Sequence, residues 1–480
     1  MSQQLAQEYS KPISDQKAII EIEEKLNKIE KELAYTIKNY YDIIKQVNLE
    51  EIKQKLNIGE AAIEFIRYRY CNKIKTDSFM YAALLVGPGA FQPKIIPLFE
   101  EKEFDSILNV SLERRADYVA SLYGPNDRGA IQVKTQKKSL YQLIWKPIEA
   151  DLKDVKTIYY SPAGLLNRIN LSAIPVESSS KIGTVTLADK YQLIELISTR
   201  QLAVANQLKI VNNDITIFGG IEFEPDTNLF ISQSNLASRS TQELSFSMID
   251  STLKGGMWDY LPWSEWEANS IHKFLMDFGF NTRLFSGFEG TEDSFKKIGR
   301  AGNPSPRVIH IATHGYFFQD LKANGQHSGV SSQSEIVFKM SDHPMLRSGL
   351  IMAGGNAAWK GKQTLEGRED GILTAYEISQ MNLSNTELVV LSACETGLGD
   401  IQGNEGVYGL QRAFKIAGAK YLIMSLWQVP DKQTSLLMTS FYKKWLENKM
   451  PIPDAFHAAQ KEMRDIGLDP YQWAGFVLVE

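Results

Sequence analysis

The fold of this 480-residue chain is constrained most by an alternation of short apolar runs with helical patterns. Runs rich in β-branched and aromatic residues lie at 62–70, 79–86, 94–99 and 157–162. A second series lies at 214–220, 282–287, 308–313, 348–354, 387–393 and 421–427. Strands that alternate with helices are typical of layered α/β proteins. We therefore predict an α/β fold with two α/β halves.

Other segments interrupt this alternation in the second half. Residues 222–256 are polar and serine-rich and predict a surface insertion, and residues 316–347 predict a long polar loop. The segment 372–381 has the apolar spacing of a helix.

A helical arm is predicted ahead of both halves. Apolar residues spaced alternately by three and four positions predict an amphipathic helix over 14–47, and a second helix is predicted over 49–56. One interpretation is an arm packed on the rest of the protein, which is the commoner use of such a helix. The other is a docking helix for a regulatory protein partner.

The composition excludes several classes of function. The chain has 52 basic and 57 acidic residues and a net charge of -5, so nothing predicts a nucleic-acid or membrane partner. No apolar run reaches the length of a membrane span, and the N-terminus lacks the apolar core of a signal peptide. Two cysteines are too few for a disulfide scaffold or a cysteine-rich zinc site. We expect a cytoplasmic protein without a metal, and without a cofactor because no nucleotide-binding loop matches.

Two predicted strands end in residues that carry chemistry. RVIHIATHGY runs into His314 and Gly315, and ELVVLSACETG runs into Cys394. All six histidines lie at position 272 or later, so residues 58–212 cannot form a Cys–His pair of their own. Ligands of an open parallel sheet bind beyond the carboxyl ends of the strands. His314 and Cys394 are therefore predicted to share one crevice if their strands are neighbours, whereas Cys71 is interpreted as structural.

This pairing suits nucleophilic catalysis. A thiol has a reference pKa near 8.5, and a nearby imidazole increases its thiolate fraction or takes its proton. The backbone N–H groups of Gly315 and Cys394 are candidate donors to an oxyanion. Taken singly, a cysteine is more often a small buried apolar residue, and a histidine more often a satisfied structural one. Their joint placement at strand ends favours a catalytic pair.

At this point the second half resembles a known family. The segments IHIATHGYF (309–317), SGLIMAGGN (348–356), DGILTAYEI (370–378), LVVLSACETG (388–397) with its continuation to 431, and PYQWAGFVLV (470–479) resemble the CHAT domain. This family is a branch of the caspase-like and separase-like cysteine peptidases. The likeness runs from about residue 57 to the C-terminus. It departs at Trp263, where the family often has glycine after Leu-Pro.

The resemblance implies a caspase-like three-layer α/β/α fold. It implies a short helical arm at 1–56, a non-catalytic supporting half at 57–212 and a catalytic half at 213–480. It also implies His314 and Cys394 as the catalytic dyad, with oxyanion donors at Gly315 and Cys394.

The segment MSLWQVPD (424–431) resembles the strand and turn that line the substrate groove of separase-like enzymes. Ser425, Leu426, Trp427 and Asp431 are therefore candidate substrate-binding residues. A second interpretation of Asp431, as the N-cap of a following helix, is slightly favoured. The residue preference at the cleaved bond stays open.

The sequence thus predicts a cysteine endopeptidase that cleaves a specific protein substrate through a thioester acyl-enzyme, under the control of a partner or trigger. One alternative is a catalytically silent caspase-like scaffold or interaction module. A non-peptidase hydrolase or transferase with a thiol nucleophile is a further alternative.

Overall fold

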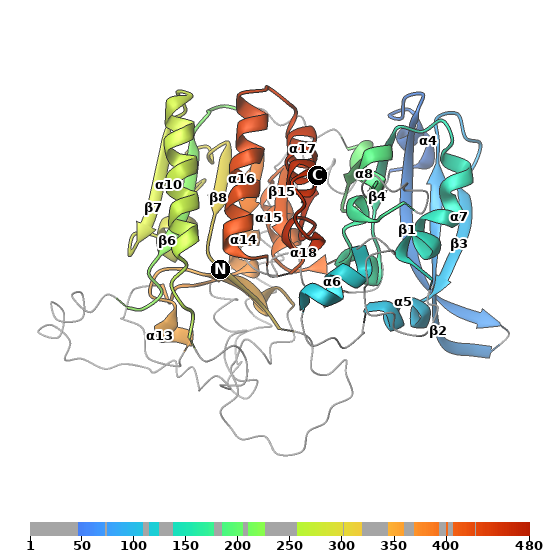
Figure 1. The fold of residues 1–480 in the computed structure, drawn as a ribbon, viewed down its shortest axis with the longest axis horizontal. Coiled ribbons are helices and arrows are strands. Elements are labelled where there is room, and N and C mark those ends of the chain that lie inside the picture. The colour runs from blue at the N-terminus through green and yellow to red at the C-terminus, as the bar shows by residue number, and fades with distance from the viewer. Residues whose placement is uncertain are drawn as a thin grey trace, which may run out of the picture. The chain divides into compact units, whose positions relative to one another are not determined.

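The structure is a computed structural model whose main elements are shown in Figure 1. It describes residues 47–72, 74–108, 115–123, 138–176, 185–204, 210–225, 257–300, 302–318, 344–359, 369–392, 400–401, 407–427 and 429–480. The helix predicted over 14–47, most of the insertion at 222–256 and Cys394 lie outside these ranges. Contacts between Cα atoms divide the chain into two compact units. Unit 1 contains Leu208–Asp400 and Tyr408–Ser435, and unit 2 contains Ile44–Gln207, Ile401–Val407 and Leu436–Glu480.

Five strands of unit 1 lie side by side in the order β15-β12-β8-β6-β7. They are β6 (Ile215–Ile221), β7 (Thr282–Gly287), β8 (Val308–Ile311), β12 (Leu388–Leu391) and β15 (Tyr421–Ser425). Every pairing among them is parallel. All residues of β6, β8 and β12 are buried. Strands buried on both faces need continuous apolar runs, and these are the runs that the sequence shows.

One face of these strands is covered by α10 (Pro262–Asp277), which lies against β6 and β7 in Figure 1. The close approach depends on Gly219 in β6. A Cβ atom there would lie 2.6 Å from the Cβ of Ala268 and 2.8 Å from the carbonyl oxygen of Ser264. Glycine therefore allows the helix to pack directly on the strand backbone.

The opposite face is covered by other helices. Phe218 precedes Gly219 in β6, so its side chain points to the other face. Its ring centre lies 5.3 Å from that of Phe295 in α11 (Glu292–Lys296). Phe295 in turn contacts Phe414 of α15 (Leu410–Ala417). Helices thus cover both faces, which confirms the predicted α/β fold and its three-layer arrangement in unit 1.

A second, antiparallel sheet of unit 1 has the strand order β11-β10-β9. It consists of β9 (His314–Phe317), β10 (Ser348–Ile351) and β11 (Ile372–Thr374). Two predictions are wrong here. The start of the predicted polar loop at 316–347 belongs to β9. The first three residues of the predicted helix at 372–381 form β11, because they pair with β10. The helix α14 (Ala375–Ser379) begins only after Thr374, whose side chain accepts a hydrogen bond from the Glu377 N–H as N-cap.

Unit 2 has its own strands in the order β3-β2-β1-β4-β5-β16. They are β1 (Glu60–Asn72), β2 (Ile74–Val86), β3 (Lys94–Glu100), β4 (Thr157–Ser161), β5 (Gln192–Glu195) and β16 (Phe476–Val479). The β1-β2 and β2-β3 pairings are antiparallel, and the pairings from β1 through β4 and β5 to β16 are parallel. The strands predicted at 62–70, 79–86, 94–99 and 157–162 are therefore confirmed.

Short helices accompany these strands. They are α4 (Leu49–Lys53), α5 (Glu101–Leu108), α6 (Arg115–Tyr123), α7 (Lys146–Glu149), α8 (Leu187–Lys190), α17 (Ile452–Asp465) and α18 (Pro470–Trp473). The helix α13 (Asn356–Trp359) belongs to unit 1, and α16 (Asp431–Leu446) begins in unit 1 and ends in unit 2.

The C-terminal residues are fixed to unit 2 by a buried amide. The side chain of Asn170 donates hydrogen bonds to the carbonyl oxygens of Ala474 at 2.9 Å and Phe476 at 3.2 Å. These bonds, together with the pairing of β16 with β5, join segments about 300 residues apart in the chain. The order of the predicted elements does not reveal such a pairing.

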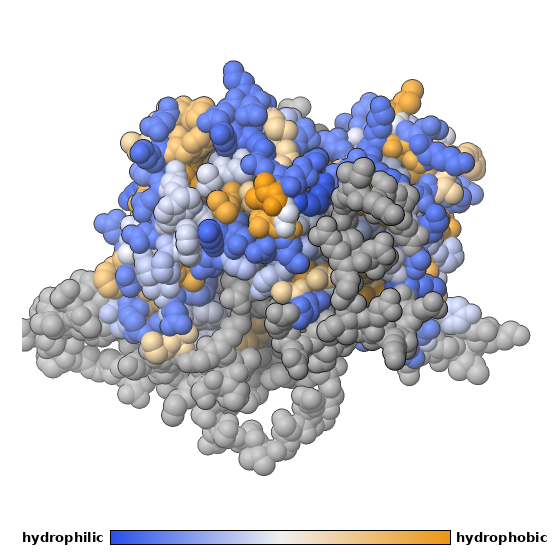
Figure 2. Space-filling model, in the orientation of Figure 1, coloured by the Kyte–Doolittle hydropathy of each residue, from blue (hydrophilic) through white to orange (hydrophobic). Residues whose placement is uncertain are grey.

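The surface carries few large apolar areas on the face shown in Figure 2, where hydrophobic side chains lie singly or in small groups among hydrophilic ones. No helix in the described ranges is both long and apolar enough to cross a membrane.

A buried carboxyl in unit 2 makes stability depend on pH. Glu195 in β5 is 7% exposed, and its Oε2 accepts a hydrogen bond of 2.8 Å from the hydroxyl of Tyr160. Burial raises the pKa of Glu195 to about 7, from an ordinary value of 4.5. The folded protein therefore binds a proton that the unfolded chain releases at lower pH.

We predict that the free energy of unfolding falls as the pH rises from about 5 to about 8, by on the order of 3 kcal/mol from this group. The stabilisation is complete below the unfolded pKa and is lost as the pH rises through the folded one. Glu195→Gln keeps an acceptor for Tyr160 and should flatten this dependence. Urea denaturation at several pH values checks it, and an equal pH slope in the variant and the wild type would contradict it.

Candidate functional site

The two strands that lead to the predicted dyad are adjacent and parallel. In the pairing of β8 with β12, Ile311 lies opposite Leu391. His314 follows Ile311 by three positions, and Cys394 follows Leu391 by three positions. The condition that these strands be neighbours is therefore met. The structure describes His314, and Cys394 lies outside the described residues.

His314 is the first residue of β9 and is partly exposed. Its Nε2 atom lies 2.7 Å from the backbone carbonyl oxygen of Asp259. A carbonyl oxygen only accepts hydrogen bonds, so Nε2 must carry the hydrogen. In the neutral ring the basic lone pair then belongs to Nδ1. The contact with Asp259 thus selects which nitrogen of His314 is able to take a proton.

Two aromatic side chains hold the ring of His314. The ring centre of Phe223 lies 5.0 Å from that of His314, and the ring centre of Trp258 lies 4.9 Å from it. Both flanking residues are buried. Phe223 comes just after β6, and Trp258 directly precedes Asp259. None of these three residues was identified from the sequence.

Gly315 presents its backbone N–H away from β10. The N–H of Phe318 donates to the carbonyl of Arg347 at 2.8 Å, which makes these two residues a hydrogen-bonded pair. Such pairs alternate with non-hydrogen-bonded pairs along an antiparallel ladder. Gly315 lies opposite Leu350 in a non-hydrogen-bonded pair. Since β9 is the outer strand of this sheet as described, the Gly315 N–H points to its open edge.

Below the strand ends lies a buried polar network centred on Glu267 of α10, which is 2% exposed. Its Oε1 atom lies 2.9 Å from Nε2 of His310, a fully buried residue in β8. Its Oε2 atom accepts a hydrogen bond of 3.0 Å from the hydroxyl of Ser392. His310 thus lies in the strand core beneath α10. The network fixes the ends of β8 and β12, since Ser392 follows β12 directly.

The candidate substrate-binding residues lie at the end of β15 and the start of α16. The side chains of Ser425, Leu426 and Trp427 are buried, at no more than 5% exposed. The alternative interpretation from the sequence was that Asp431 is the N-cap of a helix. Asp431 is instead the first residue of α16, one position after the N-cap. Burial raises the pKa of Asp431, and the charge of Glu267 raises it further. The two carboxylates therefore lie near one another within unit 1.

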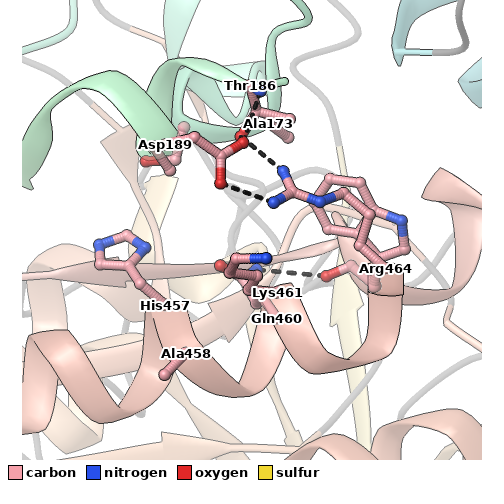
Figure 3. A pocket seen from close by; sticks show the side chains of 11 residues that line it. Ala173, Thr186, Asp189, His457, Ala458, Gln460, Lys461 and Arg464 are labelled. Atoms are coloured by element: carbon pink, nitrogen blue, oxygen red, sulfur yellow. Dashed lines mark hydrogen bonds and ion pairs between the residues drawn. The ribbon is translucent and has the colours of Figure 1, made fainter. Parts of the chain in front are cut away.

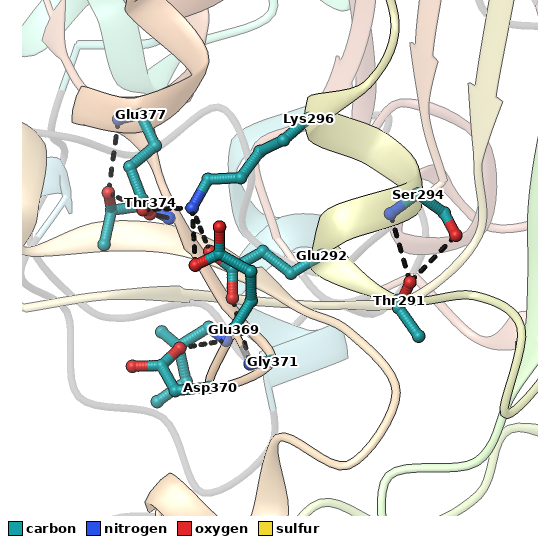
Figure 4. A network of polar contacts seen from close by, with 10 residues as sticks. Thr291, Glu292, Ser294, Lys296, Glu369, Asp370, Gly371, Thr374 and Glu377 are labelled. Carbon is teal, nitrogen blue, oxygen red and sulfur yellow. Dashed lines mark hydrogen bonds and ion pairs between the residues drawn. The ribbon is translucent and has the colours of Figure 1, made fainter. Parts of the chain in front are cut away.

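A cluster of three carboxylates in unit 1 has the composition of a metal site. One carboxylate oxygen of each of Glu292, Glu369 and Glu377 lies within 4.8 Å of the others. Lys296 points into the middle of the cluster (Figure 4). Its Nζ atom lies 2.6 Å from Glu292, 3.0 Å from Glu369 and 2.6 Å from Glu377. The lysine ammonium therefore occupies the place that a metal ion would need.

The acidic groups in and beside this cluster outnumber its one lysine, which favours a proton on some of them. Burial raises the pKa of Glu292 well above its ordinary range, and the charges of Asp370 and Glu377 raise it further. Burial also raises the pKa of Asp370 to about 6, again with the help of Glu377. Glu292 Oε2 accepts a hydrogen bond from the Gly371 N–H at 3.0 Å. The cluster thereby links α11, α14 and the start of β11.

Unit 2 contains a small pocket beside α8 and α17 (Figure 3). Arg464 in its wall lies 2.6 Å from Asp189 and donates to the Thr186 hydroxyl at 2.8 Å. Burial lowers the pKa of His457, which keeps this histidine neutral. The charge of Arg464 is paired with Asp189 in the pocket wall. These contacts join α17 to α8.

His457 changes one conclusion drawn from the sequence. Residues 58–212 contain no histidine, but α17 brings His457 into the same unit as residues 58–207.

The other cysteine, Cys71, is a free thiol exposed on β1. The interpretation of Cys71 as a structural residue is wrong, because its side chain is not packed in the core. Cys71 lies near the end of β1, where its side chain is exposed.

Comparison with known proteins places these features in a family. The family model of the CHAT domain matches residues 135–480. Tetratricopeptide repeat protein 28 of Mus musculus and of Homo sapiens are each 32% identical to the chain over 110 residues. That region is 22% of this chain but 4% of each relative, so the chain spans a small part of these relatives.

Among solved structures, the separase–securin complex of Saccharomyces cerevisiae aligns with 90% of this chain and 30% of its own, at 9% identity and a TM-score of 0.43. The Arg-specific cysteine proteinase gingipain R aligns with 69% of this chain and 64% of its own, at 9% identity and a TM-score of 0.36.

The family match includes both strands that lead to the predicted dyad, and it confirms the predicted resemblance over residues 135–480, whereas the likeness expected over 57–134 lies outside it. Because it spans more than two thirds of the 480 residues, the chain belongs to the CHAT domain family.

Proposed function

We propose that this protein is a cysteine endopeptidase in which Cys394 is the nucleophile and His314 is the base. The contact of His314 Nε2 with the Asp259 carbonyl, at 2.7 Å, supports this proposal most strongly. It leaves Nδ1 as the basic atom of the neutral ring. Cys394 follows the adjacent strand β12 by three residues, a connection that spans at most about 10 Å. A thiol at that position is within range of the site occupied by His314.

The reaction then follows from these groups. Nδ1 of His314 takes the proton of the Cys394 thiol, and the sulfur attacks the carbonyl carbon of the peptide bond. The N–H of Gly315 donates to the oxyanion that forms, with the N–H of Cys394 as the second donor. His314 returns the proton to the leaving amine as the C–N bond breaks, which leaves a thioester. Water, activated by His314, then hydrolyses the thioester and releases the carboxylate.

We place the substrate along the end of β15 and the start of α16. The buried side chains of Ser425, Leu426 and Trp427 suit them to hold this segment rather than to contact substrate side chains. Their backbone is the part that would pair with an extended substrate. Asp431 is then the residue nearest to the pocket for the side chain before the cleaved bond.

The proposal also includes a regulatory protein partner and a location in the cytoplasm. The amphipathic pattern over 14–47 suits contact of the arm at 1–56 with a regulatory protein partner. Two cysteines in 480 residues suit the reducing cytoplasm.

The direct test of the proposal compares wild-type protein with Cys394→Ala in a cell extract, with new N-termini labelled and identified by mass spectrometry. We expect a small set of new termini with wild type. Their rate of formation should fall at least about a thousandfold in Cys394→Ala and in His314→Gln, since the nucleophile and base act as a unit. Cys71→Ala is the matched control and should keep the wild-type rate. Termini that persist in Cys394→Ala would contradict the proposal, and their absence with wild type under all conditions would favour the silent scaffold.

The network below the strand ends gives a second prediction. Glu267→Gln keeps the size of the side chain but removes the carboxylate that accepts from both His310 and Ser392. We expect a loss of roughly 1–3 kcal/mol in the free energy of unfolding and slower cleavage, because Ser392 lies two residues before Cys394. Thermal denaturation and the cleavage assay measure the two effects. Asp277→Asn at an exposed position of the same helix is the control. Equal effects of the two substitutions would contradict this role of Glu267.

A further inference from the structure

We infer that Asn356 is a positioning residue for His314, acting through the backbone of Trp258 and Asp259. This inference rests on the proposed function, because it gives Asn356 a role in setting the tautomer of the proposed base. Asn356 is the first residue of α13 and is fully buried. It lies in the segment SGLIMAGGN, and the proposed reaction leaves it without a role.

The side-chain amide of Asn356 binds the backbone of Trp258 through both its oxygen and its nitrogen. Its Oδ1 atom accepts a hydrogen bond of 2.8 Å from the Trp258 N–H. Its Nδ2 group donates to the carbonyl oxygen of Trp258 at 3.0 Å and to Oε1 of Glu224 at 3.1 Å. Both backbone polar groups of Trp258 are thus fixed by one amide. The next carbonyl along the chain is that of Asp259, which accepts from His314.

Asn356 also joins the two segments that flank the histidine ring. Its backbone N–H donates to the carbonyl oxygen of Phe223 at 3.0 Å. Phe223 and Trp258 are the two aromatic residues on His314, and they lie far apart in the chain. One buried residue therefore holds both sides of the aromatic packing and the acceptor of Nε2.

A purely structural role would give a different pattern. Asn385 is another buried asparagine of unit 1, at 3% exposed. Its side chain donates to the carbonyl of Ser305 at 2.6 Å and accepts from the Val211 N–H at 2.6 Å. These partners do not contact His314 in the described residues. Loss of either asparagine should reduce stability, but only loss of Asn356 should release the Asp259 carbonyl and change the tautomer of His314.

The experiment measures the ring nitrogens of His314 directly. The full-length Cys394→Ala protein is labelled with nitrogen-15 in its histidine rings, and long-range proton–nitrogen spectra are recorded. Six histidines give few signals, and His314→Gln assigns the one of interest. We expect the Nε2–H form in the parent protein. Asn356→Asp removes both donated bonds and places a second carboxylate beside Glu224, so the His314 signals should move toward an average of both tautomers.

Further variants test the same positioning role of Asn356. In Asn356→Asp combined with Glu224→Gln, the new amide can donate to the new carboxylate, and the signals should return part of the way. If Asn356→Asp does not fold, Glu224→Ala removes one of the three bonds and should move the signals in the same direction by less. With Cys394 intact, Asn356→Asp should lower kcat roughly ten- to a hundredfold and leave KM within about twofold, because it misplaces the base.

The outcomes separate this inference from the proposed function. His314 in the Nε2–H form that does not change in Asn356→Asp would overturn the positioning role alone. The same change in Asn385→Asp would also overturn it. A parent protein with His314 in the Nδ1–H form would instead overturn the assignment of Nδ1 as the base.

Discussion

The backbone pairing of β8 (Val308–Ile311) with β12 (Leu388–Leu391) joins two strands that begin 80 residues apart in the chain. It brings the segment that continues to His314 beside the segment that continues to Cys394. All residues of both strands are buried, so the pairing is held by the core and by the helices on its two faces. A chemical group at either strand end is therefore placed by a buried strand of the core.

Polar groups around this pairing fix the positions of the strand ends more than they increase the free energy of unfolding. Burying a carboxylate is unfavourable unless its hydrogen bonds are met, and Glu267 meets them on β8 and just beyond β12. Lys296 plays a similar part among the carboxylates that link α11 to β11. Such networks tolerate few alternative arrangements, because any misplaced partner leaves a buried charge unmet.

The sequence predicted the strands of the core well, because they are short, continuous apolar runs ended by turn residues. It also predicted His314 and Cys394 at strand ends, but whether their strands are neighbours stayed open until the pairing of β8 with β12 was seen. The acceptor of His314 could not be predicted, since it is a backbone carbonyl and any residue at position 259 would supply one. Nor could the role of Asn356, whose partners Trp258 and Glu224 lie 98 and 132 residues before it.

Other differences have similar causes. Ile372–Thr374 forms a strand because β10 is available to pair with it, although its apolar spacing suits a helix equally. The C-terminal strand β16 pairs with β5 of unit 2, and nothing in its short apolar run specifies that partner. Non-local pairing decides the outcome where the local pattern is ambiguous.

The proposed chemistry depends on activation of the Cys394 thiol by His314, which the carbonyl of Asp259 orients. The most direct measurement is the rate of alkylation of each cysteine by iodoacetamide across pH 5 to 9, followed by mass spectrometry. The exposed Cys71 provides an internal comparison in the same sample. We predict that Cys394 reacts appreciably at pH 6, where an ordinary thiol with a pKa near 8.5 does not, and that His314→Gln abolishes this reactivity. A Cys394 that reacts as an ordinary thiol, with the same pH profile in wild type and His314→Gln, would contradict it.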